Sequence, residues 1–411
     1  MKILHTADWH LGQNFYCFDR TNEYIDFFRQ LKGIVAEEQP DALVISGDIF
    51  DTAVPSNAIV KLYNNELIDI VKNSPDMKIV VISGNHDSPS KLEVAESLWA
   101  NFNVSIIGTL NKVDNCYNYD KLIVPVVHDN ETIAYILAVP YIHASNYPPL
   151  GDSYADKVAG LYKLLLFRIA DRPDNVPVIA LGHLSVANAD FSGHKVVKYS
   201  DNADDLMPII GGVDSVTADV FDDALSYVAL GHFHQAQHLG QENVRYAGSP
   251  IAVSFDEKYK HFVTIAEFNG ADLKDVRLKE ITPLKPLFDI ADKAVPFEDA
   301  KKMVAALPND LSAYLRVNVL VEGVNIPNMF EQISELTENK KVNLCLVRPV
   351  YPETEAKQSP FLVESVAHFK EMSPLDIANY VYKEKYSIEM PDELKKCFSL
   401  VINELSTEEG V

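Results

Sequence analysis

The sequence predicts a layered α/β fold. Five short runs rich in β-branched residues indicate strands buried on both faces, and amphipathic stretches typical of helices lie between them. The strands are expected at 2–6, 42–46, 78–83, 176–181 and 226–230. Strand and helix in alternation favour a sheet core covered by helices, in which ligands bind beyond the carboxyl ends of the strands.

A helix is predicted after the first strand, over residues 22–38. Its apolar residues Ile25, Phe28, Leu31 and Val35 recur at helical spacing, so they are expected to share one buried face.

Each predicted strand ends in a polar cluster. The clusters are "ADWH", "SGDIFD", "SGNHDS", "LGHLS" and "LGHFH", and in four of them Gly precedes the first polar residue. A residue without a side chain permits a tight turn and a close approach of the backbone. The clusters are expected to converge on one site that contains Asp8, His10, Asp48, Asn85, His86, His183, His232 and His234.

The residue types in this site are those of a metal centre. Carboxylate, amide and imidazole ligands without thiolate suit manganese, iron or zinc, and two metals are needed to occupy so many ligands. A lone "GH" or "GD" is ordinary turn chemistry. Metal-competent side chains at five strand ends of one chain make coincidence a poor explanation.

Composition limits the compartment and the partners. The net charge of −23 and pI near 4.9 are opposite to the basic footprint of proteins that hold nucleic acid by charge alone, so bound cations or a basic partner would attract a phosphate-bearing substrate. No apolar run approaches the roughly 20 residues that cross a bilayer. Four scattered cysteines without a CxxC favour the cytoplasm, and the chain lacks the GxxxxGK[ST] motif of ATPases.

The ordered set "DWH", "GDIFD", "GNHD", "GHLS" and "GHFH" resembles the calcineurin-like metallophosphoesterases. Longer strings, such as "MKILHTADWHLGQ" and "GGVDSVTADVFDDALSYVALGHFHQAQ", resemble more narrowly the nuclease subunits of bacterial SbcCD complexes. The resemblance implies a layered metallophosphoesterase sandwich over residues 1–284, with the metal site at the carboxyl ends of the strands.

The resemblance also implies roles for the site residues. One metal would be held by Asp8, His10, Asp48 and His234, and the second by Asn85, His183, His232 and again Asp48. The metals, expected to be manganese, would activate a bridging hydroxide. His86 would support the transition state or protonate the leaving oxygen, and Asp87 would orient His86. Archaeal and eukaryotic relatives carry His where this chain has Asp51, which is expected beside the ligands or as a helix cap.

The function implied is hydrolysis of DNA at duplex ends, hairpins and single strands, in double-strand break repair, recombination and replication. The ATPase SbcC would be the partner, and the chain would act as a dimer within a heterotetramer, without a membrane. The alternatives are a phosphatase or small-molecule phosphodiesterase on the same fold, and a scaffold that has lost the metals.

The last third of the chain lacks the motif pattern. Alternating apolar residues around 315–321 and 342–346, with a helical stretch between them, predict a strand–helix–strand unit. By its position, 285–351 matches a small α+β capping domain that contacts DNA. Residues 352–411 are expected to form a linker and two C-terminal helices, which dock on the partner or pack on the parent domain.

Overall fold

The computed structural model describes residues 1–187, 189, 215–291, 293–321, 326–351, 390–391 and 394–395 of the chain. Two compact units are present. The first contains Met1–Phe288, Pro308–Arg316 and Asn339–Leu346, and the second contains the described residues among Asp289–Leu307, Val317–Glu338 and Val347–Val411. The two helices predicted beyond residue 372 lie outside the described residues, except for short pieces at 390–391 and 394–395.

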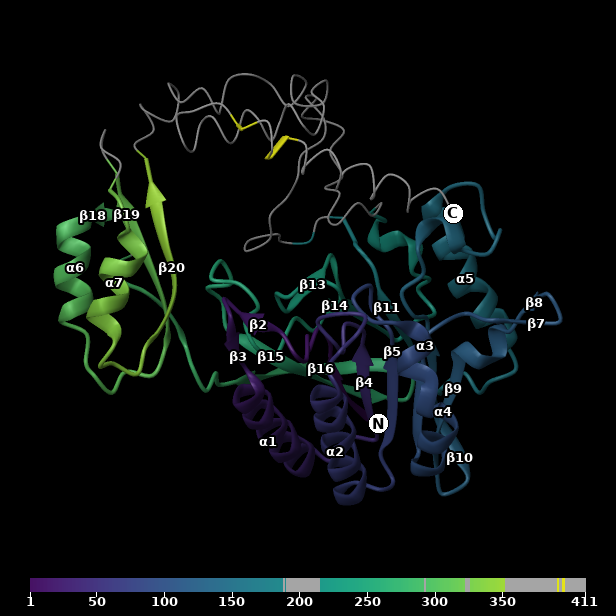
Figure 1. Ribbon diagram of the computed structural model, residues 1–411. Helices are drawn as coiled ribbons and strands as arrows, with labels where there is room; N and C mark the ends of the chain where they lie inside the picture. Colours follow the sequence, from purple (N-terminus) through teal and green to yellow (C-terminus); the bar gives the residue numbers. More distant parts are fainter. Residues whose placement is uncertain are drawn as a thin grey trace. The chain divides into compact units, whose positions relative to one another are not determined.

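Two six-stranded sheets form the centre of the first unit (Figure 1). The first sheet has the order β16-β15-β1-β4-β5-β6, and the second has the order β13-β14-β12-β11-β10-β9. The strands of the first sheet are β1 (Lys2–Thr6), β4 (Ala42–Ser46), β5 (Lys78–Ile82), β6 (Val104–Ile107), β15 (His261–Asn269) and β16 (Asp272–Ile281). Those of the second are β9 (Ile123–His128), β10 (Glu131–Ala138), β11 (Val178–His183), β12 (Tyr227–Gly231), β13 (Gln237–Leu239) and β14 (Gln241–Tyr246).

The strands next to one another at the centre of each sheet are parallel. In the first sheet β1, β4, β5 and β6 run parallel, and in the second β10, β11, β12 and β14 do. The five strands predicted from the sequence are all confirmed, with β11 and β12 ending one or two residues later than expected, so that His183 is itself the last residue of its strand.

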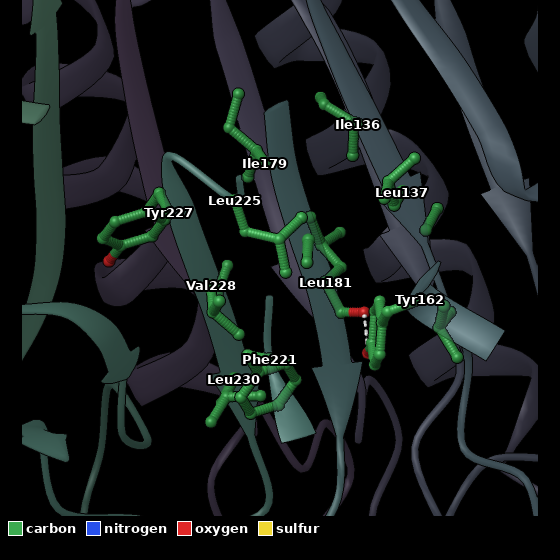
Figure 2. Packing of buried hydrophobic residues seen from close by; sticks show 14 of the residues in the cluster. Ile136, Leu137, Tyr162, Ile179, Leu181, Phe221, Leu225, Tyr227, Val228 and Leu230 are labelled. Atoms are coloured by element: carbon green, nitrogen blue, oxygen red, sulfur yellow. Dashed lines mark hydrogen bonds between the residues drawn. The ribbon is translucent and has the colours of Figure 1, made fainter. Parts of the chain in front are cut away.

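Side chains of the first sheet alternate between two hydrophobic clusters. Ile3, Val44 and Val80 pack in the cluster that also contains the second sheet, whereas Leu4 and Ile45 pack against the helices on the other face. This alternation follows from the period of two along a strand. Figure 2 shows part of the first cluster, in which side chains of β10, β11 and β12 meet those from the segment before β12.

Two long helices, α1 (Thr21–Glu38) and α2 (Asn57–Asn73), lie side by side over the first sheet (Figure 1). Phe28, Leu31 and Val35 are buried as predicted, but Ile25 is 45% exposed. The buried stripe instead begins with Tyr24, which is one position earlier, and whose hydroxyl donates to the carbonyl of His10 at 2.5 Å. That prediction was therefore wrong for Ile25.

The helix α5 (Tyr154–Arg168) packs against the second sheet. It begins with a capping box in which the Ser153 hydroxyl accepts from the backbone of Asp156, and the Asp156 carboxylate accepts from that of Ser153. The Tyr162 hydroxyl donates to the Leu181 carbonyl at 2.8 Å (Figure 2). The shorter elements are the hairpins β2 (Asn14–Phe15) with β3 (Phe18–Asp19) and β7 (Lys112–Val113) with β8 (Cys116–Tyr117), and the helices α3 (Pro89–Leu92) and α4 (Glu96–Trp99).

The strand–helix–strand unit predicted near the end of the described chain is confirmed. It consists of β19 (Tyr314–Leu320), α7 (Met329–Thr337) and β20 (Asn343–Val350). The same small sheet contains β17 (Leu287–Asp289) and β18 (Val295–Pro296), and α6 (Phe297–Ala305) lies beside α7 (Figure 1). No helix among the described residues is long and apolar enough to cross a membrane.

Candidate metal centre

Loops at the ends of five parallel strands bring the predicted site residues together. In the first sheet the loops follow β1, β4 and β5, and in the second the residues come from the last position of β11, which is His183, and from the loop after β12. The four most deeply buried site side chains are at most 3% exposed, whereas two others, from the loop after β5, are exposed. The buried four are Asp8, His10, Asp48 and His183, and the exposed two are Asn85 and His86. The inner side of the centre is therefore shielded from solvent, whereas the side formed by the loop after β5 is open to it.

The backbone has left strand geometry where the ligands stand. Asp8, His10, Asp48 and His232 have φ values of 53°, 45°, 48° and 107°. Positive φ in residues other than Gly costs about 1–3 kcal/mol each and persists only when the surroundings enforce it. Two backbone bonds do so here, from Asp8 N to the Gly47 carbonyl and from His10 N to the Asp48 carbonyl, both 3.0 Å. Asp8 and His10, two residues apart, are thus brought to the centre by turns and not by the regular alternation of a strand.

The glycines before the polar residues are required because there is no room for a side chain at these positions. A Cβ on Gly84 would collide with the Asp48 carboxylate, one on Gly231 with the Ser46 carbonyl, and one on Gly47 with the His183 ring. Gly47 also has a φ of +89°. The expectation that these positions allow a close approach of the backbone is confirmed.

Asp48 lies between two groups of potential ligands. His10, Asp48 and His86 each offer an atom such that all lie within 4.8 Å of one another, and so do Asp8, Asp48 and His183. Asp48 Oδ2 is 3.7 Å from His10 Nε2 and 3.4 Å from His183 Nε2. One carboxylate is thus within reach of both halves of the site, which is the arrangement that a bridging ligand needs.

The ring of His183 is oriented by the backbone. Its Nδ1 lies 2.8 Å from the Ser46 carbonyl, an acceptor, so Nδ1 carries a proton and donates it. In the neutral ring Nε2 is then an acceptor, and it lies 3.0 Å from Asn85 Oδ1, which is itself 3.1 Å from His232 Nδ1. Oxygen and nitrogen lone pairs directed at one point fit a cation, and a hydrogen bond from the other ring nitrogen is the usual way to orient a ligand histidine.

His10 provides a second sign that the residues fit a metal. Both of its ring nitrogens are buried, and neither makes a hydrogen bond to any residue that the structure describes. A buried polar group without a hydrogen bond is costly, and an imidazole that binds a cation is spared that cost. The rings of His86 and His234 lie edge-on to the His10 ring, at centroid distances of 4.9 and 5.1 Å.

Charges inside the site shift the protonation of its members. Burial raises the pKa of Asp8 to about 6, against the opposing effect of His183 and His234. Burial also favours a neutral Asp48, but the His183 ring outweighs it and holds the pKa of Asp48 below its usual range. Burial lowers the pKa of His183, but the Asp48 and Asp8 carboxylates raise it to about 9. The buried carboxylates of Asp8 and Asp48 are therefore stabilised by positive charge close to them, and a bound cation would supply that charge.

His86 is attached to the centre through its backbone. Its N–H donates to Asp48 Oδ1 at 2.9 Å, and its Nδ1 lies 2.8 Å from the Asp51 carbonyl, to which it donates. Asp87 does not hold the His86 ring. Its carboxylate accepts three backbone N–H bonds, from Ile49 at 3.1 Å, from Phe50 at 2.9 Å and from Gly84 at 2.9 Å, so that it ties the β4 loop to the β5 loop.

Asp51 lies beside the ligands and is not a helix cap. Its Oδ1 is 3.4 Å from His10 Nδ1, while its carbonyl oxygen holds the His86 ring. The cap of α2 is Ser56, whose hydroxyl accepts from Ile59 N. Of the two expectations for Asp51, the structure supports the one beside the ligands.

Glu257 is a site residue that the sequence did not reveal. Its carboxylate is buried, and Oε1 accepts from Nδ1 of His234 at 2.9 Å, while Oε2 accepts from Val253 N at 3.1 Å. Burial lowers the pKa of His234, but the hydrogen bond to Glu257 outweighs it and raises that pKa. In "SFDEKYK" nothing distinguishes Glu257 from a surface glutamate.

Comparison with known proteins shows the family of the chain. A model of the calcineurin-like phosphoesterase family matches residues 1–236, which contain all the site residues predicted from the sequence. The chain is 34% identical over 280 residues to the SbcD subunit of the SbcCD nuclease of Rhodobacter capsulatus, covering 66% of this chain and 67% of that one. It is 30% identical over 363 residues to the SbcD subunit of Escherichia coli K12, covering 85% of each chain. To that of Bacillus subtilis it is 33% identical over 280 residues, covering 65% of this chain and 66% of that one. The chain therefore belongs to the calcineurin-like phosphoesterase family and, within it, to the SbcD group of nuclease subunits.

Proposed function

We propose that this chain is the nuclease subunit of an SbcCD complex and hydrolyses phosphodiester bonds at DNA ends and hairpins. The observation that carries the proposal is the position of Asp48 between two groups of ligand atoms, in a chain similar over 85% of its length to a nuclease subunit. The family uses divalent metal ions. Manganese is the ion we propose, since mixed carboxylate and imidazole ligands suit it.

The ligands divide into two sets around Asp48. We assign Asp8, His10, Asp48 and His234 to one cation, and Asp48, Asn85, His183 and His232 to the other. The edge-on contact between the His183 and His232 rings, with centroids 5.2 Å apart, supports their assignment to the same set. Two bound cations lower the pKa of a water molecule between them and neutralise charge on the phosphodiester.

His86 has a different task in this proposal. The Asp51 carbonyl accepts the hydrogen bond from Nδ1–H, which fixes the ring and leaves Nε2 for the substrate. Because the His86 side chain is exposed at the open side of the centre, it can contact the scissile phosphate or protonate the leaving oxygen. Asp87 supports this geometry by fixing the loop on which His86 stands.

The rest of the chain is assigned to assembly and access. We propose that 285–351 restricts access to the metals and contacts DNA, and that 352–411 binds the ATPase SbcC, since the chain has no phosphate-binding loop of its own. We propose the cytoplasm as the compartment, where Cys17, Cys116 and Cys345, free among the residues that the structure describes, would stay reduced.

An exposed apolar stripe supports a dimer. Val94, Leu98 and Phe102 follow one another at intervals of four residues in and beside α4, and they are 81%, 60% and 47% exposed. They lie on three successive short turns, the 3-10 turn Glu93–Ala95, α4 and the 3-10 turn Ala100–Phe102, and exposed apolar residues gathered in this way mark an interaction surface. We propose that a second copy of the chain covers it.

Cleavage assays with the purified chain test the nuclease function. Linear duplex, hairpin and single-stranded DNA, together with nitrophenyl phosphate esters, are incubated with and without Mn²⁺. Manganese-dependent cleavage of DNA is expected. Rapid turnover of the nitrophenyl esters with intact DNA would identify a phosphatase or small-molecule phosphodiesterase, and inertness towards all substrates despite bound manganese would identify a scaffold.

A further inference from the structure

A pocket of about 290 Å³ adjoins the metal centre, on the side of Asn85. Asn85 lines this pocket, and its Oδ1 is also the atom that faces the rings of His183 and His232. A ligand in the pocket would therefore touch a residue that we assign to the second cation. The lining residues used below are Asn85, Thr109, Leu110, Tyr141, Ile142 and His143.

The loop after β10 forms one wall of the pocket and is anchored to the metal centre. The N–H of Tyr141 donates to the carbonyl of Ser83 at 2.9 Å, directly before the loop that contains Asn85. The Tyr141 ring lies edge-on to the His183 ring, with centroids 6.3 Å apart. Tyr141 is half-buried, so one part of it is held by the protein and another part borders the pocket.

The chemistry of the walls does not suit a phosphate. Among the residues that the structure describes, neither Lys nor Arg lines the pocket, and the carboxylate of Asp87, which does, is already occupied by three backbone N–H bonds. Half-buried apolar surface from Leu110, Tyr141 and Ile142 is combined with the polar side chains of Thr109 and His143. Such walls suit a neutral, flat group with polar edges.

We propose that this pocket binds the base of the nucleotide that flanks the scissile phosphate, with Tyr141 as the stacking surface. The proposal rests on the nuclease function proposed above. The volume of about 290 Å³ lies just below the range of roughly 300–1,000 Å³ for ligand pockets, which fits a single base. Every base has a π-face, so stacking on Tyr141 would hold DNA of any sequence beside the metals, as a nuclease for DNA ends requires.

His143 is placed to contact the edge of that base. Its Nδ1 is occupied locally, 2.8 Å from the Ser145 hydroxyl and 3.4 Å from Ser145 N, which donates to it. Because Nδ1 accepts from Ser145 N, the neutral ring carries its proton on Nε2, which can donate to an acceptor atom on the edge of any base. Like stacking on Tyr141, this contact does not depend on which base is bound.

The test compares two substrates of equal length and charge, with Mn²⁺ and the full chain. One is an oligothymidylate, and the other is an oligomer of abasic tetrahydrofuran nucleotides. We expect kcat/KM of the unchanged chain to favour the thymidylate by about tenfold, and Tyr141→Ala to reduce that ratio to near one, mainly through KM. Tyr141→Phe keeps the ring and should keep the ratio, and Phe167→Ala, an exposed aromatic residue outside the pocket, is the matched control.

Three outcomes would overturn the proposal. The unchanged chain could cleave both oligomers equally well, Tyr141→Ala could keep the full preference, or Tyr141→Ala could lower kcat on both substrates together with manganese content, which would make Tyr141 a support of His183. Failure of the nuclease function itself looks different, because the unchanged chain would then cleave neither oligomer.

Discussion

Glu257 Oε1 accepts a hydrogen bond from Nδ1 of His234 at 2.9 Å, and the His234 ring lies edge-on to the ring of His10, with centroids 5.1 Å apart. The two residues come from different loops, since His234 follows β12 and Glu257 precedes β15. A buried carboxylate in this position fixes the tautomer of a ligand histidine and increases its basicity.

Replacement of Glu257 by Gln should therefore weaken manganese binding without removing a ligand. We expect a loss of about 10- to 100-fold in the affinity of one of the two sites, the usual scale for residues that orient a ligand. Calorimetric titration with Mn²⁺ measures it, with Glu242→Gln as a control because the Glu242 side chain is 74% exposed. Unchanged affinity in Glu257→Gln would mean that the hydrogen bond has no part in metal binding.

Asp48 and His234 should differ in what their loss does to metal content. Asp48 lies in both groups of ligand atoms, so Asp48→Asn should impair both manganese sites, whereas His234→Ala should impair one. Both variants should lose hydrolysis and keep the fold, since the ligands stand on loops beyond the strands. Two undisturbed sites in the titration of Asp48→Asn would contradict the bridging role.

Much of this site could be predicted from the sequence because its residues follow strands directly. An apolar run such as "YVALG" predicts a buried strand. Because His232 is the next residue, it is predicted to lie at the carboxyl end of that strand. Glu257 could not be predicted, because its link to His234 depends on how two distant loops fold together. The role of Asp87 could not be predicted for a similar reason. Asp87 is next to His86 in the sequence, but its carboxylate accepts hydrogen bonds from the backbone of Ile49, Phe50 and Gly84.

Helix faces were predicted less well than strand ends. Ile25 and Phe28 are three residues apart, so their spacing is compatible with one buried face. In α1 the buried face instead includes Tyr24 and Phe27, because Phe27 packs edge-on against Trp9, with ring centroids 5.7 Å apart. Periodicity alone gives the width of an apolar face, and the partners across the interface decide its centre.

His86→Asn should separate catalysis from metal binding. We expect both manganese ions to remain and the catalytic rate to fall by about a hundredfold or more, the usual scale for a general acid–base group. Metal content and single-turnover cleavage of DNA are measured on the same preparation, with His238→Asn, a half-exposed histidine outside the centre, as control. Loss of one metal in His86→Asn would make His86 a ligand, and full activity would make it a turn residue.

His5 should make the fold sensitive to mild acid. It is buried between the two sheets, 3.1 Å from the Tyr227 hydroxyl and 3.3 Å from the Ser46 hydroxyl. Burial lowers the pKa of His5 to about 3, below its unfolded value of 6.5. Between these values the unfolded chain binds the proton and the folded chain does not, so the free energy of unfolding falls as pH decreases.

The contribution of His5 alone amounts to about 1.4 kcal/mol between pH 7.5 and 5.5. Urea unfolding of the unchanged chain and of His5→Leu at both pH values measures it, because other titrating groups are common to the two proteins. The variant should be less stable at pH 7.5 and should lose less stability on acidification. Equal losses in the two proteins would show that His5 does not titrate in this range.

The exposed apolar stripe of Val94, Leu98 and Phe102 should hold two copies of the chain together. Leu98 on α4 and Phe102 on the 3-10 turn after it are 60% and 47% exposed, so a charged residue there would have little effect on the fold of a monomer. In a dimer interface the same charge would be buried without a partner, at a cost of several kcal/mol. We expect the unchanged chain to sediment as a dimer and Leu98→Glu with Phe102→Glu as a monomer. Phe167→Glu, on α5 and 77% exposed, is the matched control and should remain dimeric. A double variant that remains dimeric would exclude this stripe as the interface, and a monomeric Phe167→Glu would place the interface on α5.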